Sequence, residues 1–219
     1  MGTLTRSLAN NITTGGVIAP AGITNATVAD ITSFPNASGG TLVLLSTQTA
    51  SASATISFTT GLDSTYDEYI FKFIDINPAT DDVEFTFNMS TDNGSNYNVT
   101  KTSTNFATYH DEADTTSALS YQASSDLAQS TIFQRIAGAN GNGADENCSG
   151  TLQLFNPAST VYVKHFISNF QKNTYHNYSF SDYVAGYGNT TTAINAIQFK
   201  FSSGNIADGQ IKLYGIKDS

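Results

Sequence analysis

The chain has few basic residues, a single cysteine, no tryptophan and no long apolar run. Nine Lys and Arg stand against 18 Asp and Glu in 219 residues, a net charge of −9. Such a chain does not build the positive surface that neutralises phosphates, so no nucleic-acid partner is expected. One cysteine, Cys148, excludes an internal disulfide, which suits a reducing compartment. No segment predicts insertion into a membrane, and residues 1–10 lack the apolar core of a secretory signal.

The residues that are abundant favour strands and turns. The chain holds 30 Thr, 24 Ser and 20 Asn, about a third of the total, together with 14 Phe and 11 Tyr. Thr and aromatic side chains favour half-buried strands, whereas Asn and Ser favour turns. The composition therefore predicts an all-β protein whose outer faces are polar.

Residues 1–40 differ from the rest of the chain. Their apolar side chains are thinly spread, follow neither a helical nor a strand period, and are interrupted by Gly and Pro. We interpret the segment as an extended N-terminal arm that orders against a partner, the alternative being a flexible leader. The arm residues expected to contact that partner are Leu8, Ile12, Val17, Ile18, Ile23, Val28, Ile31 and Phe34.

Residues 41–219 predict one domain of successive strands. Val83, Phe85, Phe87 and Met89 alternate with polar residues and are expected to face a core, whereas residues 69–76 are apolar on both faces, as in a central strand. The one helix candidate is the short segment 124–129. The remaining strands are expected at residues 41–46, 54–59, 97–106, 131–136, 150–155, 161–167, 183–187, 196–201 and 210–216. Strands at this spacing predict an antiparallel two-sheet β-sandwich of jelly-roll type.

Four polar features are compared with catalytic or metal-binding sites. Residues 90–97 (STDNGSNY) resemble an Asp-box hairpin, in which Asp92 fixes a tight turn rather than binding a metal. Residues 109–114 place His110 among three carboxylates, which are expected to be solvated on a loop. His165 is assigned with Ile167 to the apolar face of its strand, and Cys148 to a small buried position. No catalytic residue, metal site or cofactor is expected, and the chain is predicted not to be an enzyme.

The segment 170–187 (FQKNTYHNYSFSDYVAGY) interleaves aromatic rings with amide and hydroxyl side chains. Flat apolar rings beside hydrogen-bonding groups are typical of surfaces that bind sugars or proteins. The alternative is that alternate rings pack into the sandwich. The residues proposed to contact a receptor or glycan are Tyr175, His176, Tyr178, Tyr183 and Tyr187.

Three segments of the chain resemble one protein family. They are residues 60–85 (TGLDSTYDEYIFKFIDINPATDDVEF, where Thr60 replaces a Ser), residues 193–216 (AINAIQFKFSSGNIADGQIKLYGI) and residues 8–32 (LANNITTGGVIAPAGITNATVADIT). They resemble virion structural proteins of marine tailed bacteriophages, whose members include head-decoration, tail-fibre-like and unassigned proteins. The motifs are structural, so no functional residue is carried over from the family.

The resemblance implies a non-enzymatic protein on the virion surface, made in the host cytoplasm. As a capsid decoration protein, it would dock on the major capsid protein through its arm and project the sandwich outward. As a short tail or head fibre, it would attach to a tail adaptor and contact a host surface glycan. Self-association as a homotrimer is expected in either case. Outside the family, the alternatives are a carbohydrate-binding module and a fragment of a glycan depolymerase.

Overall fold

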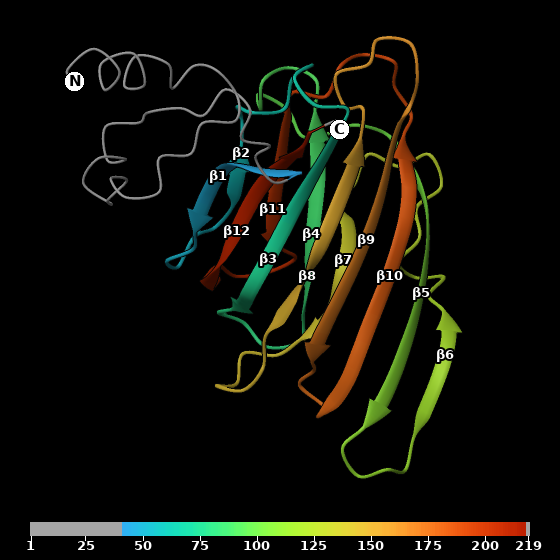
Figure 1. Cartoon of the computed structure of the whole chain (residues 1–219). Helices are drawn as coiled ribbons and strands as arrows, with labels where there is room; N and C mark the ends of the chain where they lie inside the picture. Colours follow the sequence, from blue (N-terminus) through green and yellow to red (C-terminus); the bar gives the residue numbers. More distant parts are fainter. Residues whose placement is uncertain (1–40, 218–219) are drawn as a thin grey trace, which may run out of the picture. The chain divides into compact units, whose positions relative to one another are not determined.

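The computed structural model describes residues 41–217, which form twelve β-strands and no helix. The long neighbouring strands β9, β10 and β5 lie side by side to the right of β8 in Figure 1. The strands are β1 (Leu42–Thr49), β2 (Ile56–Phe58), β3 (Glu68–Pro78), β4 (Val83–Ser90), β5 (Lys101–Asp111), β6 (Ser117–Tyr121), β7 (Gln134–Asn140), β8 (Cys148–Phe155), β9 (Lys164–Asn173), β10 (Tyr178–Gly188), β11 (Ala196–Phe201) and β12 (Ile206–Ile216).

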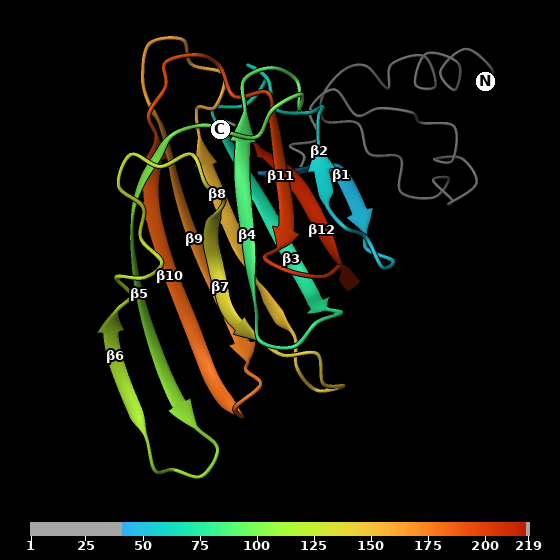
Figure 2. The same ribbon diagram turned by 180° about the vertical axis from the view of Figure 1, so that it is seen from behind.

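The strands form two antiparallel sheets. The large sheet has eight strands in the order β1-β12-β3-β8-β9-β10-β5-β6, and the small sheet has four in the order β2-β11-β4-β7. The predicted all-β fold with two antiparallel sheets is confirmed. The hairpin of β5 and β6 lies at the opposite edge of the large sheet from β1 and extends past the end of β7 (Figures 1 and 2).

The core between the sheets is dominated by phenylalanine rings. Phe199 of β11 lies at its centre, with ring centroids 5.0 Å from Phe73 and 5.3 Å from Phe71 in β3. On the neighbouring strand β4, Phe85 lies 6.1 Å from Phe199, and Phe87 lies 5.1 Å from Phe166 of β9. These rings are fully or almost fully buried. Edge-to-face and offset pairs of this kind add to the hydrophobic stabilisation of the core.

The inward face of β4 agrees with its sequence pattern, but its other face does not. Val83, Phe85, Phe87 and Met89 are buried, as predicted. Thr86 and Asn88, which the alternation assigns to solvent, are buried as well. The segments before β5 and before β7 cover that face of the small sheet. The Asn88 amide donates hydrogen bonds to both of them, at the backbone carbonyls of Tyr97 (2.7 Å) and Thr131 (2.9 Å).

Two further predictions are wrong. Residues 124–129 form turns and bends instead of a helix, because Ser125 N–H closes a turn on the Gln122 carbonyl. The face assignment of β9 is inverted: His165 and Ile167 point to solvent, and Phe166, Ser168 and Phe170 point to the core. Strand β6 was not predicted at all.

The expected arm and its eight apolar contact residues lie outside the described residues, so they remain predictions. In the described part of the chain, no helix has the length and hydropathy needed to cross a membrane.

Candidate functional site

The aromatic segment 170–187 forms the β9–β10 hairpin. Successive side chains of a strand point to opposite faces, so the five residues proposed as contacts do not form one surface. Tyr183 and Tyr187 lie on the outer face of the large sheet, which the small sheet does not cover, whereas Tyr178 lies on the inner face. Tyr175 and His176 lie in the turn between the two strands, with ring centroids 3.8 Å apart.

Tyr183 belongs to a larger apolar surface that we call the outer aromatic face, formed by Phe106, Leu119, Tyr121, Ile167 and Tyr183. The register aligns Tyr121, Phe106 and Tyr183 across β6, β5 and β10, and the rings of Phe106 and Tyr183 stack with centroids 5.0 Å apart. All five side chains are exposed, from 36% for Tyr183 to 69% for Leu119. Contiguous exposed apolar surface is typical of a site that contacts another molecule.

A shallow hollow of about 480 Å³ lies beside the outer aromatic face. Its lining includes Ala185 and Gly186 of β10, between Ile167 and the edge-to-face pair of Tyr187 and His165. A Cβ atom at Gly186 would overlap the Thr102 carbonyl and the Phe166 ring, so only glycine fits this position. Tyr183 and Tyr187, four residues apart on one strand, are separated by about 13 Å, with the small Ala185 side chain between them.

The inner face carries a second group of rings beyond the region that β7 covers. Tyr109 of β5 stacks on Phe180 (5.6 Å between centroids) and on Tyr178 (5.8 Å), both from β10. The Lys172 ammonium lies 4.2 Å from the centroid of Phe180, a cation–π contact. These rings are half-buried. This group therefore serves mainly to pack the turn end of the β9–β10 hairpin against β5.

The Asp92 turn has the geometry that the sequence predicts. One carboxylate oxygen of Asp92 accepts hydrogen bonds from the Ser90 hydroxyl (2.6 Å) and the Asn96 backbone N–H (2.9 Å), and the other from the Asn96 amide (2.7 Å). Asn93 and Gly94 adopt positive φ angles of 59° and 84°. The Ser90 and Asn96 hydrogen bonds lower the pKa of Asp92 to about 2. Asp92 therefore fixes the turn.

The polar cluster around His110 is also used locally. Asp111 accepts hydrogen bonds from the backbone of Thr115 and Thr116 and from the Thr115 hydroxyl, and these bonds lower the pKa of Asp111. His110 pairs with Asp114 at 3.1 Å on the surface. Both contacts close the β5–β6 turn. Within residues 41–217, no three His, Cys, Asp or Glu side chains come close enough together to hold a metal ion.

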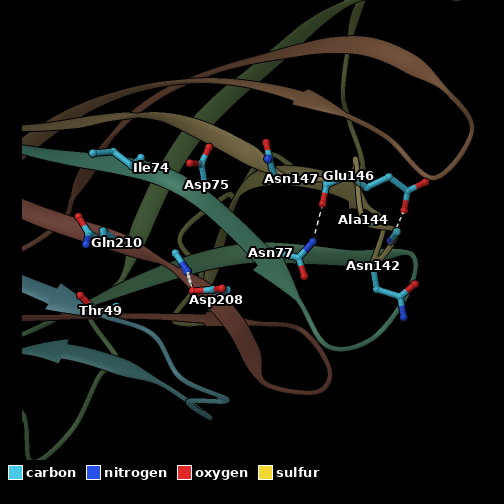
Figure 3. A pocket seen from close by; sticks show the side chains of 12 residues that line it. Thr49, Ile74, Asp75, Asn77, Asn142, Ala144, Glu146, Asn147, Asp208 and Gln210 are labelled. Atoms are coloured by element: carbon cyan, nitrogen blue, oxygen red, sulfur yellow. Dashed lines mark hydrogen bonds between the residues drawn. The ribbon is translucent and has the colours of Figure 1, made fainter.

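A groove of about 620 Å³ lies where irregularities in β3 and β12 face each other (Figure 3). Its three carboxylates are Asp75, Glu146 and Asp208. Glu146 accepts the Gly143 N–H (2.6 Å) and Asp208 accepts the N–H of Gly209 (2.8 Å), so these two stabilise the loop backbone. Only Asp75 has a carboxylate with no such role, and one carboxylate does not make a catalytic pair.

Half of the Lys and Arg side chains in the two-sheet body, residues 41–217, are buried or nearly buried. Eight of the nine Lys and Arg residues belong to residues 41–217, because Arg6 alone precedes them. Lys101, Lys164 and Lys172 are buried, and the Arg135 side chain is only 15% exposed. The positive charge left on the surface comes from Lys72, Lys200, Lys212 and Lys217. The body is therefore more acidic on its surface than its composition indicates.

Cys148 is fully buried, as predicted. Burial raises the pKa of its thiol to about 12, so the sulfur is neutral and behaves as a small apolar group.

Comparison of the chain with protein-family models, with curated protein sequences and with solved structures found no match.

The sequence pointed to Tyr183 and Tyr187 but missed the residues that complete their surface. Phe106 and Tyr121 belong to segments 60 to 80 residues earlier in the chain, and only the pairing of β10 with β5 and of β5 with β6 brings them together. No local pattern marks them, because Phe106 lies in a mostly polar strand and Tyr121 is the one aromatic residue of β6.

Proposed function

We propose that this chain is a non-enzymatic structural protein on the outer surface of a tailed-phage virion, built on a sandwich of jelly-roll type. The strand order carries the proposal. Four strands of the large sheet (β1-β12-β3-β8) and the whole small sheet (β2-β11-β4-β7) form two matched sets. Among these eight strands the chain crosses between the two sets at every connection except the one from β4 to β7. This is the winding of an eight-stranded jelly roll, an architecture used in viral capsid and lectin domains.

The positions of two family-like segments support the same proposal. Residues 60–85 contain β3 and the start of β4, and residues 193–216 contain β11 and β12. β3 pairs with β12 in the large sheet, and β4 pairs with β11 in the small sheet. The segments that resemble virion proteins are therefore each other's neighbours in both layers, where they determine the architecture.

Two insertions distinguish this jelly roll. β5–β6 and β9–β10 add four strands to one edge of the large sheet and carry the outer aromatic face. The most direct placement is as a capsid decoration protein. Residues 1–40 would dock on the major capsid protein, and the acidic body would project outward as part of a homotrimer. The surface excess of carboxylates would keep neighbouring particles apart.

A second placement is favoured by the outer aromatic face itself. Exposed rings beside hydroxyl and amide groups suit a carbohydrate or receptor surface, because they combine flat apolar area with hydrogen bonds. In that case the protein is a short tail or head fibre attached to a tail adaptor, and the face contacts a host surface glycan.

The proposal is tested by deleting residues 1–40 and assembling particles with the truncated chain. We expect a folded body, shown by an unchanged β-type circular dichroism spectrum, that no longer loads onto particles. Normal loading of the truncated chain would contradict docking through the arm.

The matched control keeps the arm and replaces Phe106 and Tyr183 by Ser. For a decoration protein, this variant loads normally and particles still bind their host. If loading is normal but host binding is lost, the fibre placement replaces the decoration placement.

A further inference from the structure

Lys172 and Asp182 form an ion pair in the interior of the sandwich. Lys172 is near the end of β9, where it pairs in the sheet with Phe180 of β10. Asp182 lies two residues after Phe180 on the same strand. The two charged groups are in direct contact, and both side chains are completely buried. Burying two charges costs free energy that their attraction does not always recover, so such a pair requires a specific reason.

The surroundings of the pair come from β7 and β8. The Gly138 N–H donates to Asp182 Oδ2 (3.3 Å), and the Arg135 guanidinium lies 3.9 Å from Oδ1. A side chain on Gly138 would overlap the Arg135 guanidinium, so this glycine lets β7 lie close over the carboxylate. Within the described residues, Asp182 Oδ1 accepts no hydrogen bond. Of the two carboxylate oxygens, Oδ2 thus accepts a hydrogen bond from a backbone N–H, whereas Oδ1 accepts none from the described residues.

The Lys172 amine has the environment of a nucleophile. The side chains around it include the ring of Phe180 and, directly opposite on β8, the buried Cys148. Burial lowers the pKa of Lys172, because the charged ammonium is disfavoured in an apolar environment. Desolvation of this kind is one of the ways in which proteins activate lysine for attack on a carbonyl carbon.

We propose that Lys172 and Asp182 condense to an intramolecular amide bond that joins β9 to β10. Transfer of one proton from Lys172 Nζ to Asp182 Oδ2, the oxygen that it contacts, gives a neutral amine and a neutral carboxylic acid without any outside acid or base. Lys172 Nζ then attacks Asp182 Cγ and forms the C–N bond. The Arg135 guanidinium, 3.9 Å from Oδ1, stabilises the negative charge that develops on that oxygen, while the Gly138 N–H holds Oδ2 in place.

The second half of the reaction breaks the bond between Cγ and Oδ2. Oδ2, which already carries the acid proton, takes a second proton from Nζ and leaves as water, and Oδ1 becomes the carbonyl oxygen of the amide, so one amine and one carboxylic acid give one amide and one water. Neither an oxidant nor a further reactant is needed. The product has no charge at this position, which removes the cost of the buried ion pair. It also fixes the register of the two strands that carry Tyr183 and Ile167.

The test is the mass of one tryptic peptide from the full-length folded protein, denatured only after it has matured. Trypsin does not cleave after an acylated lysine, so the cross-link predicts a single peptide of residues 165–200, lighter by the mass of one water. A succinimide at Asp182 would lose the same mass, but trypsin would still cleave after Lys172. Cleavage after Lys172, with both product peptides at their unmodified masses, would overturn the proposal.

Two variants assign the cross-link. Asp182→Ala restores cleavage after Lys172, whereas Lys212→Arg, which changes a lysine on the outer face of β12, leaves the light 165–200 peptide unchanged. If the light peptide persisted in Asp182→Ala, Asp182 would not be the partner and the proposal would be wrong. The wild-type peptide decides the question even where a variant does not fold.

Discussion

The buried amine of Lys101 makes the stability of this protein depend on pH in a direction that can be predicted. Lys101 begins β5, and its ammonium donates to Asn88 Oδ1 (2.5 Å) and to the carbonyl of Val99 (2.8 Å). Burial lowers its pKa from the ordinary value of 10.5 to about 7. Between these two values the unfolded chain binds a proton that the folded chain does not. The free energy of unfolding contributed by Lys101 therefore rises with pH in this window.

The size of the effect follows from the two pKa values. From about pH 7.5 to about pH 8.5, Lys101 adds about 1 kcal/mol to the free energy of unfolding. Well below pH 7 its contribution no longer changes, because both states are protonated. The raised pKa of Cys148 acts in the opposite direction, because the unfolded thiol ionises first as the pH rises. A single curve for the wild type would therefore mix several groups.

The assay is urea unfolding of the wild type and of Lys101→Met, which is neutral at every pH and of similar length. Contributions from Cys148, Lys164 and Lys172 are common to both proteins, so they cancel in the difference between the two unfolding free energies. We expect that difference to grow in favour of the wild type by about 1 kcal/mol over this pH unit. A difference that stays constant, or that shrinks as the pH rises, would refute the assignment of a depressed pKa to Lys101.

Two other predictions concern the core and the Asp92 turn. Phe199→Ala removes the ring that contacts Phe71 and Phe73 and should cost about 3–5 kcal/mol in urea unfolding. The exposed Phe106→Ala should cost less than about 1 kcal/mol, and equal losses would show that the ring core is misassigned. The folded-state pKa of Asp92, about 2, lies below its ordinary value of 3.8, so its stabilisation is lost as the pH falls through this range. Between about pH 4 and about pH 2, the thermal midpoint of the wild type should fall more steeply than that of Asp92→Asn. Parallel curves would show that the turn does not depend on the carboxylate.

The fold could be predicted where local pattern and burial agree. In β4 the alternation of Phe85 and Phe87 with polar residues identified the core face correctly, and β11 and β12 were placed within a few residues. In β9 the same reasoning failed. The residues that point inward include the polar Lys164, Ser168 and Lys172, whereas the apolar Ile167 points to solvent. The alternation of apolar and polar residues therefore predicts the wrong inward face for β9.

The reason for that failure is non-local. Lys172 is accommodated inside because Asp182 lies on the next strand, and Lys101 because Asn88 supplies an acceptor from the other sheet. A local sequence pattern around Lys172 or Lys101, read over about ten residues, does not include the partner that makes burial of that lysine possible. The same limit applies to the candidate site. Tyr183 was identified from its segment, but Phe106 and Tyr121 reach it only through strand register.

The measurement that tests the proposed function most directly is a cryo-electron microscopy reconstruction of the purified particle that carries this protein. Decoration predicts copies of the two-sheet body on the outside of the shell, in icosahedral register, with the chain connected to the capsid surface through residues 1–40. A few copies confined to the tail would support the fibre placement instead. A purified particle that lacks this density on both shell and tail would contradict a virion role.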